Sequence, residues 1–92
     1  MGYTVLMLME HDKSRRSATH TRGYRYMLKR LRKARLDAQL TQVQVAKALG
    51  RPQSYVTKCE LGERRIDPLE LQHFATLYRK RFSYFLPPAG GR

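Results

Sequence analysis

The amino-acid sequence predicts an all-α fold, and three observations lead to this prediction. Apolar residues recur at intervals of three and four through much of residues 24–86, which is the period of amphipathic helices. Residues that start and stop helices separate these stretches. No part of the sequence alternates apolar and polar residues over a length that would build a sheet.

The first predicted helix covers residues 24–38. Its apolar side chains recur on one face as Met27, Leu28, Leu31, Ala34 and Ala38. A second helix is predicted over residues 42–49, because Thr41 is a good N-cap and Gln44, three residues later, can complete a capping box. Gly50 can adopt the positive φ that ends this helix.

A third helix is predicted over residues 53–61. Pro52 favours its start, because a proline disfavours helical geometry in the preceding residue and itself fits the first turn of a helix. Val56 and Cys59, three residues apart, form the inward face, and Gly62 ends the helix. Cys59 is expected to be a small buried apolar residue, and a reactive thiol is the alternative.

The fourth predicted helix has a strong start, with Asp67 as N-cap, Pro68 at the first position and Glu70 at the third. Its apolar residues have helical spacing and define a buried face. The members of this face are Leu71, Phe74, Ala75 and Tyr78. Three basic residues follow, and residues 82–86 can form one further short helical turn.

The chain divides into three segments. Residues 24–86 are predicted to form one small domain, as a chain of 92 residues allows. Residues 1–23 form an N-terminal extension, with an apolar run at residues 3–9 followed by a basic arm. The apolar run is either a disordered terminus or an extra strand or short helix that packs on the domain or across a dimer. Residues 87–92 are predicted to be a disordered end.

The composition favours a polyanionic partner. Lysine and arginine number 19 against 7 aspartate and glutamate residues, which gives a formal net charge of +12. Such an imbalance points first to nucleic acid and second to an anionic membrane surface, and a merely soluble basic protein is the remaining alternative. The apolar run at residues 3–9 is far shorter than the roughly 20 residues that span a bilayer, so no membrane partner is expected.

The sequence favours a cytoplasmic protein that is not an enzyme. A single cysteine excludes an internal disulfide and a thiolate metal cluster within one chain. The histidines, His11, His20 and His73, have no metal-ligand spacing with one another or with the cysteine. No phosphate-binding loop, dinucleotide-binding glycine motif or nucleophile elbow occurs. We therefore expect no catalytic residue, no metal and no cofactor.

The predicted helices 42–49 and 53–61 form a helix-turn-helix, in which the second helix enters the DNA major groove. That helix offers four candidate base-reading residues, namely Gln53, Ser54, Tyr55 and Lys58. Glutamine can donate to and accept from adenine, and lysine can donate to guanine. Serine and tyrosine can contact a thymine methyl group, a base or a phosphate.

A second group of residues around this helix is expected to bind DNA phosphates. Its members are Gln42, Arg51, Thr57, Arg64 and Arg65. Gln42 lies near the start of its helix, where backbone N–H groups and the helix dipole favour anions. Such contacts position a protein on DNA and set the salt dependence of binding, but they carry no sequence information. Each arginine taken singly can also be a solvated surface charge.

Several residues occur at a characteristic spacing, namely Leu40, Thr41, Gln42, Ala46, Leu49, Gly50, a hydroxyl residue near the head of helix 53–61, Glu60 and Gly62. With this pattern, residues 31–78 resemble the phage-repressor type of helix-turn-helix domain, the Xre or Cro/C1 family. The resemblance implies a five-helix, lambda-repressor-like domain that binds a two-fold-symmetric operator as a homodimer. It also implies that Arg35 pairs with Glu60 and ties the reading helix to the scaffold.

Two residues depart from the family pattern. Pro52 stands where many relatives carry a serine or threonine cap, so Ser54, Gln53 or a backbone group must satisfy the first N–H donors of the third helix. Leu61 replaces a residue that is often Asn, Ser or Arg, which removes one phosphate contact. Residues 1–23 have no counterpart in the minimal family domain.

These features predict a sequence-specific, double-stranded DNA-binding transcriptional regulator, with a repressor favoured, that acts as a homodimer on a palindromic operator. The alternative is an antitoxin-like autoregulator that also grips a partner protein through its N- or C-terminal segment. A protein-interaction or RNA-binding module is a third possibility. The candidate dimer surface is the apolar cluster Phe82, Tyr84, Phe85 and Leu86. Packing of this cluster under the first helix of the same chain remains open.

Overall fold

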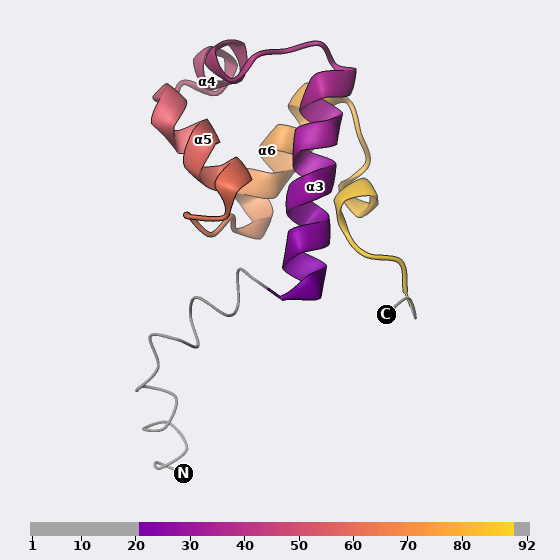
Figure 1. Cartoon of the computed structure of the whole chain (residues 1–92). Helices are drawn as coiled ribbons and strands as arrows, with labels where there is room; N and C mark the ends of the chain where they lie inside the picture. The colour runs from indigo at the N-terminus through magenta and orange to yellow at the C-terminus, as the bar shows by residue number, and fades with distance from the viewer. Residues whose placement is uncertain (1–20, 90–92) are drawn as a thin grey trace, which may run out of the picture.

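The computed structural model of the chain describes residues 21–89 (Figure 1). Over this range the chain is all-α, as predicted, and it contains no strand. The elements are α3 (Arg22–Asp37), α4 (Gln42–Leu49), α5 (Gln53–Leu61), α6 (Pro68–Tyr78) and the 3-10 helix η1 (Phe82–Phe85). The expectation of five helices therefore needs correction for the described residues, because the fifth element is a short 3-10 helix. None of the helices described is long and apolar enough to cross a membrane.

The predictions for the apolar run at residues 3–9, for the basic arm up to residue 20 and for residues 90–92 lie outside the described residues.

The first helix begins earlier than predicted. Thr21 is its N-cap and accepts a hydrogen bond from the Tyr24 N–H to its hydroxyl oxygen at 3.2 Å. Arg22 and Gly23 therefore belong to α3 rather than to an extension.

The predicted starts of α4 and α6 are confirmed, and both are capping boxes. In α4 the Gln44 N–H donates to the Thr41 hydroxyl at 3.1 Å, and the Thr41 N–H donates back to the Gln44 side chain at 2.9 Å. In α6 the matching bonds between Asp67 and Glu70 measure 2.8 and 3.0 Å. These local bonds satisfy N–H groups that a helix leaves unpaired at its first turn.

Two glycines end helices in the left-handed region, as the sequence predicted. Gly50 caps α4 with φ 67°, and Gly62 caps α5 with φ 78°. A residue in the left-handed conformation at this position turns the chain sharply. This conformation costs free energy for any residue that has a Cβ atom. Gly50 therefore sets the direction in which the chain leaves α4 and enters α5.

Replacing Gly50 with alanine is expected to lower the free energy of unfolding by about 1 kcal/mol. An added Cβ would have no atom within 4 Å, so the loss would come from the positive φ alone. The matched control is Gly23→Ala in α3, whose Cβ would make an ordinary contact at 3.6 Å with Pro87. This second change should raise stability slightly, because alanine favours a helix over glycine. Urea unfolding of both variants checks the prediction. It would be contradicted if both substitutions changed the free energy of unfolding in the same direction.

The hydrophobic core lies where α3 contacts α5, α6 and η1. Figure 1 shows α3 in the middle of the molecule, with α4 and α5 on one side and η1 on the other. Every element contributes a side chain with no exposed surface, namely Leu31, Val45, Val56, Phe74 and Phe85. Because α4 and α5 each bury such a residue, the core fixes both helices of the helix-turn-helix relative to α3.

The C-terminal aromatic cluster packs mainly within the chain. Phe85 is fully buried, and its element η1 contacts α3 and α6. The Arg30 guanidinium of α3 donates to the Tyr84 carbonyl at 3.0 Å and lies 3.8 Å from the centroid of the Tyr84 ring. Phe82 is half-buried, and only Leu86, at 41% exposure, keeps a largely open side chain. The expectation of Phe85 as a dimer residue is thereby corrected, because its ring is used to close the core under α3.

Candidate nucleic-acid interface

α5 has one buried face and one polar face. Val56 and Cys59 are fully buried, as predicted, and the pKa of the Cys59 thiol is raised to about 11, chiefly by burial. Gln53, Ser54 and Lys58 are exposed. Since successive residues of a helix are about 100° apart, the exposed three lie together on the side away from the core. Three of the four candidate base-reading residues thus share one open surface.

Tyr55, the fourth candidate, does not lie on this surface. Its side chain is only 8% exposed, and its ring stacks on Phe74 with centroids 6.1 Å apart and planes within 5°. Burial raises the pKa of the Tyr55 hydroxyl to about 12. The buried position of Tyr55 does not fit the base-reading role expected of it. The buried arc of α5 is wider than Val56 and Cys59 alone indicated, because α6 covers the adjacent position as well.

Tyr55 instead positions two of the predicted phosphate-binding arginines. The Arg51 guanidinium lies 4.4 Å from the centroid of its ring, and the Arg64 guanidinium lies 4.9 Å from it. Arg51 precedes α5 and Arg64 follows it. One buried aromatic ring thus holds a cation at each end of α5 through cation–π contacts.

Arg64 is further held by α6. Its Nη1 donates to Glu70 Oε1 and to the Arg65 carbonyl, both at 3.0 Å. Burial would raise the pKa of Glu70, but hydrogen bonds from the Asp67 N–H and from Arg64 outweigh this effect and hold that pKa below its usual value. Arg64 is therefore a paired charge, whereas Arg65 is exposed and forms no ion pair with a described residue.

A hydrogen-bonded chain connects α3, α4 and α5. Arg35 donates to both carboxylate oxygens of Glu60, at 2.7 and 3.1 Å, so the pair that the resemblance implied is present. Arg35 also donates to the Leu40 carbonyl at 3.0 Å. Gln42 Nε2 donates to Glu60 Oε1 at 3.0 Å, and the Thr57 hydroxyl donates to Gln42 Oε1 at 2.7 Å. The start of α4 is thereby joined to the middle and the end of α5.

This arrangement limits what Gln42 and Thr57 can offer a phosphate. A phosphate oxygen accepts hydrogen bonds, and a threonine hydroxyl has a single hydrogen to give. In Thr57 that hydrogen is committed to Gln42. Gln42 commits one amide hydrogen to Glu60 and keeps the other. Of the two side chains, only Gln42 can bind a phosphate without breaking the network.

The start of α5 has no side-chain cap. Pro52 occupies the N-cap position, and neither Ser54 nor Gln53 forms a capping bond. Of the three expected alternatives, a backbone group acts here, because the Tyr55 N–H donates to the Pro52 carbonyl at 3.0 Å. Backbone N–H groups at this end therefore have no side-chain acceptor among the described residues. An anion or water can satisfy them, because the helix dipole favours negative charge there.

Sequence reasoning missed the supporting role of two tyrosines at the candidate interface. One is Tyr55, discussed above. The other is Tyr24 of α3, whose hydroxyl accepts a hydrogen bond from the Ile66 N–H at 2.9 Å. This bond ties the loop that carries Arg64 and Arg65 to α3. No local sequence signal predicts it, because the two residues lie 42 positions apart.

Among the described residues, no group of three or more His, Cys, Asp or Glu side chains could hold a metal ion.

A model of the helix-turn-helix domain matches residues 28–79, which is more than half of the chain. This range covers α3 from residue 28 to its end and the whole of α4, α5 and α6. Comparisons with curated proteins and with solved structures gave no significant match.

Proposed function

Because the chain belongs to the Xre-like helix-turn-helix family, whose domain binds DNA, we propose that it is a sequence-specific transcriptional regulator that reads double-stranded DNA with α5. The observation that carries this proposal is the exposed polar face of α5. Gln53, Ser54 and Lys58 lie together on it, while the opposite face is locked into the core. A helix supported in this way can enter the major groove as a rigid unit.

The three exposed residues have the chemistry for direct base reading. Gln53 can bond an adenine edge with its donor and acceptor together, and Lys58 can donate to guanine. Ser54 can bond a base or a phosphate. Tyr55 is left out of this set because its ring is buried on Phe74.

The phosphate contacts are assigned to a smaller set than the sequence suggested. Arg51 and Arg65 are exposed cations that precede and follow α5, and Arg64 is held by Tyr55 and Glu70. Gln42 adds its remaining amide hydrogen at the start of α4. These groups are expected to account for the position of the protein on the duplex and for much of the salt dependence.

We further propose that the protein acts as a repressor and binds a palindromic operator as a homodimer. A single helix in one groove contacts only a few base pairs, and a symmetric pair doubles the number that is read. With Phe85 buried within the chain, Leu86 and the half-buried Phe82 and Tyr84 remain as candidates for the contact between copies.

The decisive experiment compares binding to random duplex DNA and to the DNA upstream of the protein's own gene at two salt concentrations. We expect a preference of roughly 10³ or more for one palindromic site and a steep loss of affinity as salt increases. Equal binding to both duplexes would contradict sequence-specific regulation. No binding to any duplex at low salt would contradict the DNA-binding role as a whole.

Replacing Gln53 or Lys58 with alanine is expected to relax specificity at one base pair each, by about 1–3 kcal/mol. The reason is that each side chain is exposed on the reading face and supports no neighbouring helix. The matched control is Arg65→Ala, which should weaken binding to all sequences alike and reduce the salt dependence. Affinities for a set of single-base operator variants measure both effects. If Gln53→Ala lowered the affinity for all operator variants by the same factor, Gln53 would not be a base-reading residue.

A further inference from the structure

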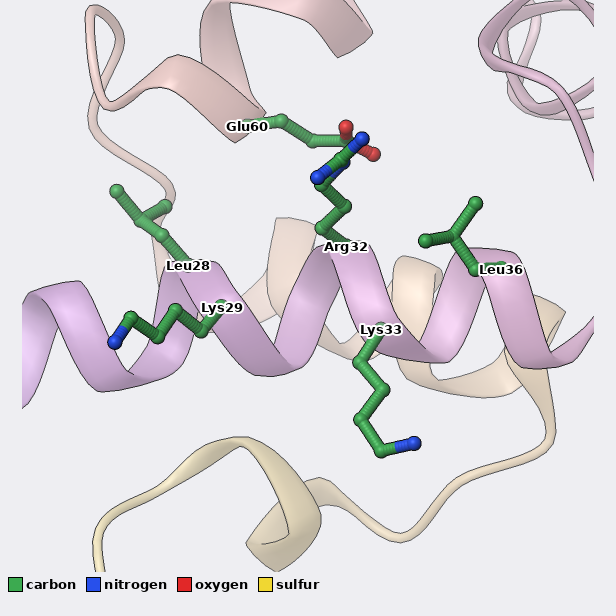
Figure 2. Close-up of a pocket in the computed structure, with 6 residues that line it drawn as sticks. All are labelled: Leu28, Lys29, Arg32, Lys33, Leu36 and Glu60. Atoms are coloured by element: carbon green, nitrogen blue, oxygen red, sulfur yellow. The ribbon is translucent and has the colours of Figure 1, made fainter.

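A hollow of about 330 Å³ lies on the side of α3 next to the end of α5 (Figure 2). Its lining consists of Leu28, Lys29, Arg32, Lys33 and Leu36 of α3, together with Glu60 of α5. No residue assigned above to base reading or phosphate binding takes part in it. The hollow is thus a separate surface feature of the domain.

Three of the lining residues form a straight row. Leu28, Arg32 and Leu36 are four residues apart, so they follow one another along one face of α3. Figure 2 shows their side chains on the side of the helix that faces Glu60, whereas Lys33 points away from it. The row is about 12 Å long, from eight residues at a rise of about 1.5 Å each. Leu36 is 52% exposed, whereas Leu28 is half-buried and packs against the core.

The hollow is positively charged despite the presence of Glu60. The Glu60 carboxylate accepts two hydrogen bonds from Arg35 and one from Gln42, so its negative charge is already compensated. Arg32 forms no ion pair with any residue of the described part. The centre of the row is therefore a cation that has a leucine on each side.

This chemistry fits a peptide better than it fits DNA. A phosphate backbone would satisfy Arg32 but would offer nothing apolar to the two leucines. A helix that carries a carboxylate with an aliphatic residue four positions before it and another four positions after it would satisfy all three. We propose that the row Leu28–Arg32–Leu36 binds an acidic amphipathic helix of a partner protein. Such a surface would let the regulator contact a second protein while α5 remains in the groove.

The test uses the full chain, labelled with ¹⁵N, and two synthetic alanine-based helical peptides. The first peptide carries the row Leu-Ala-Ala-Ala-Glu-Ala-Ala-Ala-Leu, which reads the same in both directions. The second has the same composition, but its glutamate is moved by two positions and leaves the leucine row. We expect the first peptide to shift the amide resonances around Leu28, Arg32 and Leu36 and to bind at least about tenfold more tightly than the second.

Two variants and a control locate the site. Leu36→Asp and Arg32→Gln should each weaken binding of the first peptide by about tenfold or more, whereas Leu69→Asp should change it by less than about twofold. Leu69 is a 72% exposed leucine of α6, outside the hollow. Circular dichroism checks the fold of each variant, and Leu36→Ala replaces Leu36→Asp if the latter unfolds.

Four results of the peptide experiments would overturn the proposal. They are no binding of the first peptide, equal binding of the two peptides, equal loss in the Leu69 control, and resonance shifts confined to other parts of the domain. A fall of about tenfold or more in duplex-DNA affinity for both row variants would assign the row to DNA instead. A photo-crosslinker placed at position 36 that captured residues 1–20 of the same chain would likewise rule out a partner as the occupant.

Discussion

Replacing Glu60 with alanine is expected to lower the free energy of unfolding by about 3–5 kcal/mol. The Glu60 and Arg35 side chains are only 5% and 10% exposed, so the change would leave the Arg35 guanidinium buried without its counter-charge. The substitution would also remove the acceptor of the Gln42 amide and loosen α4 from α5. Because small domains have about 5–15 kcal/mol of stability, urea unfolding at low temperature is the suitable measurement.

The control for this prediction is Asp37→Ala. Asp37 lies 3.5 Å from both Lys33 and Lys80, but its side chain is 41% exposed, so its loss should cost less than about 1 kcal/mol. A double variant, Arg35→Met with Glu60→Leu, should recover much of the stability lost in Glu60→Ala, since no buried charge is left unpaired. If Glu60→Ala lowered the free energy of unfolding by as little as Asp37→Ala does, the buried Arg35–Glu60 pair would contribute no more to stability than an exposed ion pair.

Replacing Phe85 with alanine is expected to cost about 3–5 kcal/mol, the range found for large aromatic side chains in a core. Phe85 has no exposed surface, and it anchors η1 between α3 and α6. Because this packing is within one chain, the loss should be the same at two protein concentrations that differ by about tenfold. Urea unfolding at both concentrations checks the prediction.

Leu86→Ala is the matched control for Phe85, because Leu86 is the next residue and is 41% exposed. It should cost less than about 1 kcal/mol. A loss in Phe85→Ala that grew or shrank with protein concentration would place the ring in a contact between copies, contrary to its position in the core. The same measurement on Leu86→Ala shows whether that side chain contributes to the proposed homodimer.

The candidate site could be predicted in part. The exposed positions of Gln53, Ser54 and Lys58 follow from the helical period once Val56 and Cys59 are placed inward. The period could not decide the position of Tyr55, which lies at the border between the two faces of α5. Whether a border residue is buried depends on the element that packs beside it, and here Phe74 of α6 supplies the stacking partner. The same holds for Thr57, whose hydroxyl hydrogen is taken by Gln42 from another helix.

The sequence by itself determined the starts of α4 and α6 and the ends of α4 and α5. Thr41, Asp67, Gly50 and Gly62 act on backbone groups within a few residues of themselves, so their effects do not depend on the rest of the fold. Only the tertiary structure decided which side chains at the edges of those helices are open to a partner. Tyr55 and Phe85 are buried because α6 and α3 cover them, and such contacts between distant segments leave no local pattern in the chain.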